Sequence, residues 1–390
     1  MKILYINHDN NINGSTIALM NIVYELSKRH EIRVITPITN NMNNSLLINY
    51  FIKNIIKYYS LDYCLTVYPG FRRNFLLWIN DTLNMIKKTI KVRKQIKGII
   101  EDFKPNIVHT NNGPIDIALN PCKDKNVPHI WHLREYSDLG IGYEIFPSTK
   151  LWRKKILSSG NYNVAITKCI YDYYNLRECD KIIYDGPINL EEELPENNKK
   201  EKYFLFVGVV SQEGKGFYDA LVAFNEIKKR HNDYKLLAAG PFYSKTHYGA
   251  QILNFIKNHG LDNSVELLGH RNDVFRLMNK ATALLVTSYY EGFGFTTAEA
   301  MFCDCLVLGR NTTGTKEQFD NGFNKYGTDI GLRFNTTEEL IHCMERAIIE
   351  DTTNIRKRAK LIVKELYNSK QTCENLESYY QKINKIHQFS

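Results

Sequence analysis

The segment ALLVTSYYEGFGFTTAEAM, residues 283–301, decides the fold of this chain. Its first five residues form a short apolar run typical of a buried parallel strand, and its last residues have the composition of a helix. Between them, Gly292 and Gly294 permit positive φ angles and a close approach of the backbone to a ligand. The first turn of the helix offers unpaired N–H groups to an anion. The segment therefore predicts a strand, a glycine loop and a helix, with an anion site at the turn.

The same alternation of apolar runs and helical segments extends in both directions, in two series. It predicts an α/β fold with two Rossmann-like, doubly wound domains that face each other across a cleft. We expect an N-terminal domain over 1–190, a linker over 191–201, a C-terminal domain over 202–370, and a last helix over 371–390 that packs back on the N-terminal domain. The predicted strands are Lys2–Asn7, Ile32–Thr36, Asn106–His109, His129–His132, Asn163–Ile166 and Lys181–Tyr184 in the first series, and Tyr203–Gly208, Lys235–Ala239, Val265–Leu268, Ala283–Thr287 and Cys305–Leu308 in the second.

Composition narrows the class of protein. The 390 residues are 43% hydrophobic and 24% charged, with a net charge of +9, which is ordinary for a globular protein with a modest preference for anionic ligands. No run of about 18 apolar residues predicts a membrane span, and the N-terminal sequence lacks the pattern of a signal peptide. The eight cysteines are dispersed, without metal-ligand spacing. We expect a cytoplasmic protein without a metal site.

The segment 288–301 resembles the retaining GT-B glycosyltransferases of family 4, the group 1 glycosyltransferases, whose signature is two glutamates eight positions apart around a Gly-Phe-Gly loop. The resemblance covers nearly the whole chain. It implies that Glu291 contacts hydroxyls of the donor sugar and is catalytic, and that Glu299 holds the nucleotide ribose. It also implies that the backbone amides of Gly292, Phe293, Gly294 and Phe295 meet the donor phosphates.

A second match to this family lies at Gly208–Gly216, where Lys215 fits the lysine that binds the diphosphate. The arginine usual in the family is replaced by Val209. Arg271 and Lys316 are the candidates to supply the missing cation, and we expect Arg271 to contact the donor. The loop 311–317 is expected to close the donor pocket.

The carboxyl ends of the first strands carry the remaining candidates. Gly14, in the turn after the first strand, is expected to face the donor. His132 matches the active-site histidine of the resembling enzymes, and its imidazole is expected to orient the donor sugar. Arg134, Glu135 and Asn111 are expected to bind the acceptor.

The segment Arg72–Lys104 is strongly basic and carries an apolar stripe. One interpretation is contact with an anionic membrane surface, which would suit a lipid-linked acceptor. The other is that the stripe packs on the domain core and the lysines face water.

The family resemblance implies a retaining glycosyltransferase, and we expect it to be metal-independent and to need no cofactor. It would move a sugar from a nucleotide-sugar donor, a UDP-sugar or GDP-sugar, to a hydroxyl of a glycan or lipid-linked glycan, in surface polysaccharide synthesis at the cytoplasmic face of the membrane. No D-x-D motif occurs in the sequence. The alternatives are a nucleotide-sugar epimerase of GT-B-like fold and a non-catalytic nucleotide-sugar-binding protein. Only the basic excess favours nucleic acid, so no nucleic-acid partner is expected.

Overall fold

The computed structural model describes the chain except for residues 12, 39–44, 71–74, 140–141, 191–198 and 389–390. The chain divides into two compact units. Unit 1 comprises Met1–Pro187 together with Ser369–Ser390, and unit 2 comprises Ile188–Asn368. Most of the predicted linker, 191–198, lies outside the described residues.

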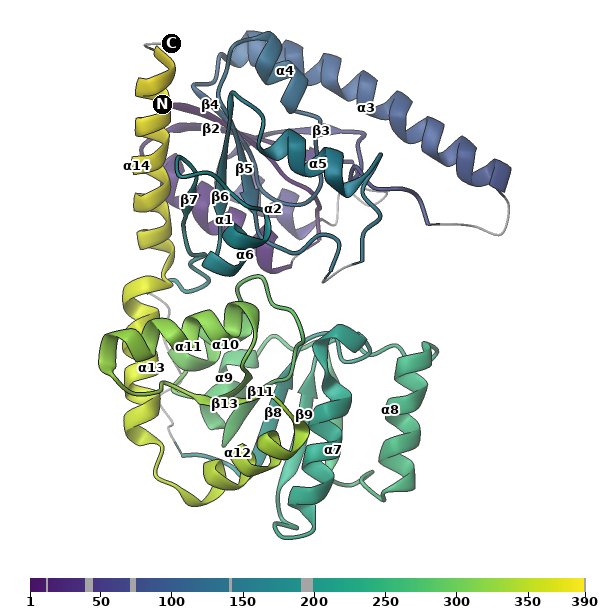
Figure 1. Cartoon of the computed structure of the whole chain (residues 1–390), viewed down its shortest axis with the longest axis vertical. Helices are drawn as coiled ribbons and strands as arrows, with labels where there is room; N and C mark the ends of the chain where they lie inside the picture. The colour runs from purple at the N-terminus through teal and green to yellow at the C-terminus, as the bar shows by residue number, and fades with distance from the viewer. Residues whose placement is uncertain (12, 39–44, 71–74, 140–141, 191–198, 389–390) are drawn as a thin grey trace. The chain divides into compact units, whose positions relative to one another are not determined.

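Unit 1 is built on a parallel sheet with strand order β3-β2-β1-β4-β5-β6-β7 (Figure 1). Its strands are β1 (Lys2–Ile6), β2 (Glu31–Pro37), β3 (Lys57–Leu61), β4 (Ile107–Thr110), β5 (His129–Leu133), β6 (Asn161–Ala165) and β7 (Lys181–Ile182). Its helices are α1 (Gly14–Ser27), α2 (Leu46–Lys53), α3 (Phe75–Phe103), α4 (Leu119–Asp124), α5 (Thr149–Ile156), α6 (Lys168–Tyr173) and α14 (Ser369–Gln388).

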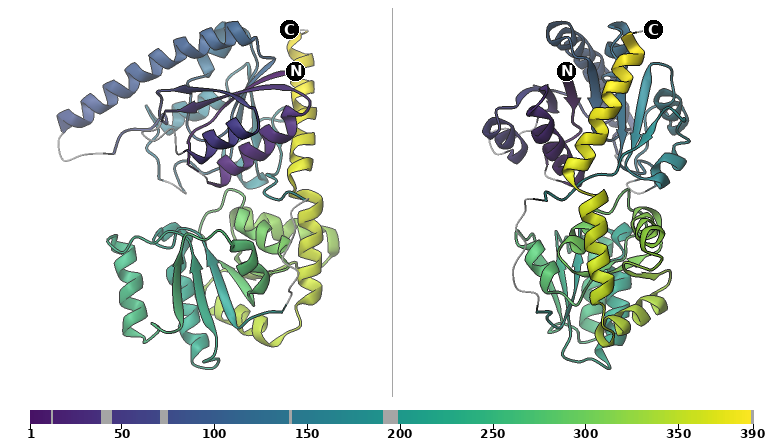
Figure 2. Two further views of the ribbon diagram at one scale, coloured as in Figure 1. Left: turned by 180° about the vertical axis from the view of Figure 1, so that it is seen from behind. Right: turned by 90° about the vertical axis from the view of Figure 1, so that its left-hand side faces the viewer.

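Side chains of unit 1 alternate between the two faces of the sheet, as strand geometry requires. Ile3 and Tyr5 of β1 belong to a buried cluster with α1, α2 and α14, whereas Leu4 and Ile6 belong to another with α3. Figure 2 shows α14 running alongside the sheet. Both faces of the sheet are therefore covered, which agrees with the nearly continuous apolar run of its central strand β1.

Unit 2 repeats the design with a parallel sheet of order β10-β9-β8-β11-β12-β13. Its strands are β8 (Tyr203–Val207), β9 (Lys235–Ala239), β10 (Val265–Gly269), β11 (Ala283–Val286), β12 (Leu306–Arg310) and β13 (Leu332–Phe334). Its helices are η2 (Glu213–Lys215, 3₁₀), α7 (Phe217–Lys228), α8 (His247–Asn258), α9 (Val274–Lys280), α10 (Phe295–Phe302), α11 (Thr313–Tyr326), α12 (Thr337–Ile349) and α13 (Thr353–Leu366). The predicted fold class, two Rossmann-like parallel-sheet units, is confirmed. The edge strands β3 and β13 were not predicted.

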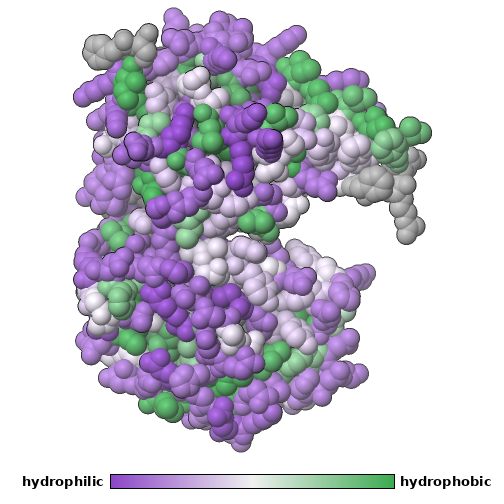
Figure 3. Space-filling model, in the orientation of Figure 1, coloured by the Kyte–Doolittle hydropathy of each residue, from purple (hydrophilic) through white to green (hydrophobic). Residues whose placement is uncertain are grey.

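Helix α3 contains most of the basic segment, of which residues 72–74 lie outside the described residues. Its C-terminal half packs on the core through Val92, Ile96 and Ile100. Towards its N-terminus, apolar side chains such as Leu76 and Leu83 are exposed, and Figure 3 shows hydrophobic surface over this helix. No helix of the described residues is long and apolar enough to cross a membrane.

Candidate active site

Lys215 and Glu291 meet in unit 2 although 76 residues separate them. The Lys215 Nζ atom lies 2.8 Å from Glu291 Oε1, and both side chains are partly exposed. Lys215 ends the short η2 turn after β8, and Glu291 follows β11, the neighbouring strand. The carboxyl ends of adjacent parallel strands thus bring a cation and a carboxylate to one place.

The loop that follows Glu291 is fastened to the first turns of α11. The Glu291 carbonyl accepts a hydrogen bond from the Gly314 N–H at 3.0 Å, and the Gln318 side-chain amide donates to the carbonyls of Phe293 at 2.6 Å and Gly294 at 3.1 Å. Gly314 permits this close approach because a Cβ atom there would lie 2.5 Å from the Phe293 carbonyl oxygen.

These bonds fix the direction of the loop amides. In a trans peptide the C=O and the following N–H point to opposite sides. Because the carbonyls of Phe293 and Gly294 face Gln318, the N–H groups of Gly294 and Phe295 face away from α11. Gly294 adopts a φ of 91°, which glycine accommodates without strain. The result is a pair of amides at the start of α10 that point away from α11, and amides at a helix start are groups that can bind an anion.

The other residues of unit 2 predicted to bind the donor differ in how exposed their side chains are. The Phe293 ring is buried against Phe295 and Tyr367, so only its backbone can serve a ligand. Glu299 lies in α10 and is half-buried. Arg271 is exposed and pairs with Asp273 at 2.8 Å.

Both residues proposed to replace the family arginine, Arg271 and Lys316, form ion pairs within the protein. Lys316 forms an ion pair with Asp320, as Arg271 does with Asp273. Arg310, at the end of β12, bonds to Asp219 and to two backbone carbonyls, so its guanidinium is also engaged within unit 2. Lys215 is thus the cation that lies against the predicted catalytic carboxylate.

In unit 1, His132 and Arg134 lie at the carboxyl end of β5 and belong to a buried polar network. Arg134 donates from Nε to the Asn111 carbonyl at 2.9 Å, and from its terminal nitrogens to the Asn111 side chain, Asp185 and His132 Nδ1. The His132 side chain is 0% exposed, and burial together with the Arg134 charge lowers its pKa well below the usual value. These predicted residues come together, but they bond mainly to one another.

The network continues to the C-terminal helix. His132 Nδ1 lies 3.1 Å from His109 Nε2, the His109 Nδ1 atom lies 2.6 Å from the Tyr380 hydroxyl of α14, and that hydroxyl lies 2.9 Å from the Tyr5 hydroxyl. Burial also lowers the pKa of His109, so both imidazoles are neutral at pH 7.

Arg134 determines which atom donates in each hydrogen bond of this buried network. A guanidinium can only donate, so His132 Nδ1 must accept and its proton is on Nε2. His109 Nε2 therefore donates to His132, which leaves His109 Nδ1 to accept from Tyr380. The His132 Nε2–H is a buried donor without a hydrogen-bond partner in the described part of the chain, 3.9 Å from Asp185.

Glu135, directly after β5, lies nearer the surface. Burial raises its pKa to about 7, partly offset by a hydrogen bond from Asn112. A Cβ atom added at Gly113 would lie 3.9 Å both from Glu135 Oε1 and from His8 Cβ, so the ends of β1, β4 and β5 converge here. This is the point at which the strand order of unit 1 reverses, where α/β proteins bind ligands. The predicted Gly14 begins α1 beside it, after the N-cap residue Asn13.

Sequence reasoning missed Gln318, Asp185 and Tyr380, whereas it placed His109 in a segment expected to line the acceptor side. Tyr380 and Asp185 carry no local motif, and their contacts depend on pairings over 51 or more residues. The described residues contain no group of three or more His, Cys, Asp or Glu that could hold a metal ion.

Comparison with known proteins gives a family and several relatives to which this chain is similar. Residues 189–362 match the family described as Glycosyl transferases group 1. An uncharacterised glycosyltransferase of Methanocaldococcus jannaschii is 28% identical over 61% of this chain and 65% of its own length. A Campylobacter jejuni N-acetylgalactosaminyltransferase acting on a diphospho-undecaprenol acceptor is 27% identical over 43% of this chain and 41% of its own length. The chain thus spans less than two thirds of these relatives.

Solved structures resemble nearly the whole chain. Anabaena HepE in complex with UDP has a TM-score of 0.72 at 16% identity, covering 98% of this chain and 100% of that one. Staphylococcus aureus TarM, as a mutant in complex with fondaparinux, α-GlcNAc-glycerol and UDP, has a TM-score of 0.72 at 14% identity, covering 97% of this chain and 99% of that one. The fold is that of the GT-B glycosyltransferases, and residues 189–362 match the group 1 glycosyltransferase family.

Proposed function

We propose that this protein transfers a sugar from a nucleotide-sugar donor, in particular a UDP-sugar, to a hydroxyl of a glycan or lipid-linked glycan, with retention of anomeric configuration. The observation that carries the proposal is the contact of Lys215 with Glu291, which begins the loop whose Gly294 and Phe295 amides point away from α11. The HepE complex with UDP and the polyprenol-linked acceptor of the Campylobacter relative support the donor and acceptor classes.

In this mechanism the donor diphosphate binds at the start of α10. Departure of the nucleotide concentrates negative charge on the phosphate, and the Lys215 ammonium and the two amides stabilise that charge. Lys215 must then turn from Glu291 to the phosphate, which frees the Glu291 carboxylate to accept hydrogen bonds from the sugar hydroxyls. These cationic and dipolar groups stabilise the phosphate charge that a metal ion stabilises in other enzymes, so we propose a metal-independent reaction.

Unit 1 is proposed to bind the acceptor at the convergence of β1, β4 and β5. Glu135 is the carboxylate there that can accept a hydrogen bond from the acceptor hydroxyl. Arg134 and Asn111 act by positioning the loop, because their polar groups are bonded within the protein. A direct contact of His132 with the donor sugar would require its buried Nε2–H to become accessible.

The test is a panel of UDP-, GDP-, dTDP- and ADP-sugars screened by thermal shift, followed by transfer assays. A ligand that prefers the folded state raises its stability, so the true donor raises the melting temperature. Glu291→Gln should remain folded, bind UDP and lose transfer. Undiminished turnover by Glu291→Gln, or a product with inverted anomeric configuration by NMR, would contradict the proposal.

A further inference from the structure

A hollow of about 710 Å³ opens between α5 and α6 in unit 1, within the size range of ligand sites. Neither the donor site nor the Glu135 edge uses it. Three of its lining residues are cationic and none is acidic; the lining comprises Thr149, Lys150, Arg153, Lys154, Leu157, Tyr174 and Asn175. A concave surface of one charge attracts ligands of the opposite charge.

The cations of this hollow have no ion-pair partner among the described residues. Lys155, the next residue on α5, pairs with Asp116, whereas Lys150, Arg153 and Lys154 form no ion pair with any described residue. The Arg153 guanidinium lies 4.4 Å from the centre of the Tyr173 ring and donates to the Tyr173 carbonyl at 2.9 Å. Aromatic contact thus fixes this cation without cancelling its charge.

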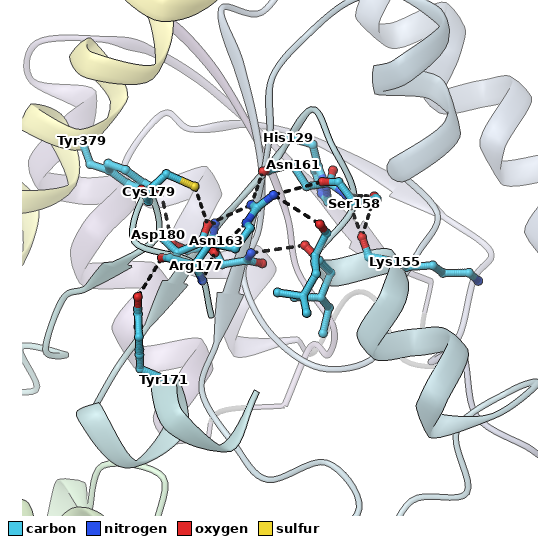
Figure 4. A network of polar contacts seen from close by, with 12 residues as sticks. His129, Lys155, Ser158, Asn161, Asn163, Tyr171, Arg177, Cys179, Asp180 and Tyr379 are labelled. Carbon is cyan, nitrogen blue, oxygen red and sulfur yellow. Dashed lines mark hydrogen bonds and ion pairs between the residues drawn. The ribbon is translucent and has the colours of Figure 1, made fainter. Parts of the chain in front are cut away.

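The walls of the hollow are held by a second network, shown in Figure 4. Arg177 donates to the carbonyls of Leu157 and Ser158 at the end of α5, and to Asn161 and Asp180. Leu157 lines the hollow, so this network sets the position of one wall. A preformed site loses less conformational entropy on binding.

Tyr174 connects the hollow to the proposed acceptor edge. Tyr174 is one of the residues that line the hollow, and its hydroxyl donates to the Glu135 carbonyl at 3.0 Å and lies 3.2 Å from Ser137 Oγ. One residue that lines the hollow thus also contacts the backbone of Glu135, which places the hollow next to the proposed acceptor edge.

We propose that the hollow formed by Lys150, Arg153 and Lys154 binds a phosphate or diphosphate group of the acceptor. This assignment rests on the proposed function, because it takes the Glu135 edge as the acceptor site. Guanidinium and ammonium groups without acidic partners are the groups that proteins use for phosphate. The phosphate could belong to a lipid-linked diphosphate or to a phosphorylated glycan, and both present the same charge here.

The first test titrates inorganic pyrophosphate into the full-length protein with UDP at saturation, so that the donor site is occupied. The variant Lys150→Gln/Arg153→Gln/Lys154→Gln should weaken pyrophosphate binding at least about tenfold, as loss of charge-assisted hydrogen bonds implies. The control Lys370→Gln/Lys382→Gln/Lys385→Gln removes the same charge from exposed positions of α14 and should change it less than about twofold.

Equal binding by wild type and the α5 variant, or equal weakening in both variants, would overturn the site. Failure of the proposed function would appear separately, as absence of UDP binding, and would leave the pyrophosphate titration readable.

The second test compares KM for three acceptors: a lipid-linked diphosphate glycan, a water-soluble glycan phosphate and the same glycan without phosphate. The α5 variant should raise KM only for the phosphorylated acceptors. A rise confined to the lipid-linked acceptor identifies the lipid diphosphate as the source, and a rise for both identifies the phosphate itself. An equal rise for the unphosphorylated glycan, or none for any, would refute the acceptor assignment.

Discussion

Replacing Tyr380 with phenylalanine tests the buried network that links α14 to His132. The change removes one hydroxyl, which donates to His109 and accepts from Tyr5. Both partners are fully buried, so neither can turn to water. A buried polar group left without a partner costs about 1–3 kcal/mol, and we expect unit 1 to lose about 3 kcal/mol in total.

Tryptophan fluorescence can follow this unit by itself, because Trp78, Trp131 and Trp152 all lie in unit 1. A loss of about 3 kcal/mol lowers the melting temperature of a domain of this size by about 6–12 °C. In ¹⁵N-histidine-labelled protein, wild-type His109 and His132 should each carry the proton on Nε2. Tyr380→Phe should alter the His109 resonances.

Tyr379→Phe is the matched control, since the Tyr379 hydroxyl donates to backbone carbonyls and touches neither histidine. It should lower stability while leaving both histidine spectra unchanged. A proton on His109 Nδ1 in the wild type, or an unchanged melting temperature in Tyr380→Phe, would refute the reasoning.

Three further predictions concern the two units. Burial raises the pKa of Glu135 to about 7, so the folded state holds the Glu135 proton more tightly than the unfolded state does. The resulting stabilisation is present at low pH and is lost as pH rises through 7. Relative to Glu135→Gln, the free energy of unfolding of the wild type, measured in urea, should fall by about 2 kcal/mol between pH 5 and 8. Gln318→Leu should weaken UDP binding roughly tenfold by calorimetry, since two carbonyls of the loop lose their donor, and unchanged affinity would remove its positioning role. Replacing Lys87, Lys91 and Lys94 of α3 with glutamate should abolish flotation with anionic vesicles if that helix contacts the membrane, and unchanged flotation would exclude it.

The fold class was predictable because buried parallel strands are continuous apolar runs. Strand β8, with sequence YFLFV, is of this kind. Strand β3, with sequence KYYSL, lies at a sheet edge and is largely half-exposed, so no apolar run marks it. Strand β13 has only three residues.

Sequence could predict the site only where a local motif carried it. Lys215 and Glu291 each belong to such a motif, whereas Gln318 acts through two backbone carbonyls that no residue pattern marks. For Arg271 and Lys316 a signal did exist: an aspartate two or four residues onward, which pairs with each of them.

The membership of α14 in unit 1 has a consequence for synthesis of the chain. Leu376, Tyr380 and Ile383 complete a buried cluster with β1 and α1, yet the ribosome makes them after all of unit 2. Of the two units, unit 1 is therefore the one whose synthesis begins first and whose core is completed last. Until α14 has been synthesised, Tyr5 and His109 lack the helix that covers them. Unit 2 can therefore finish folding before the core of unit 1 is complete.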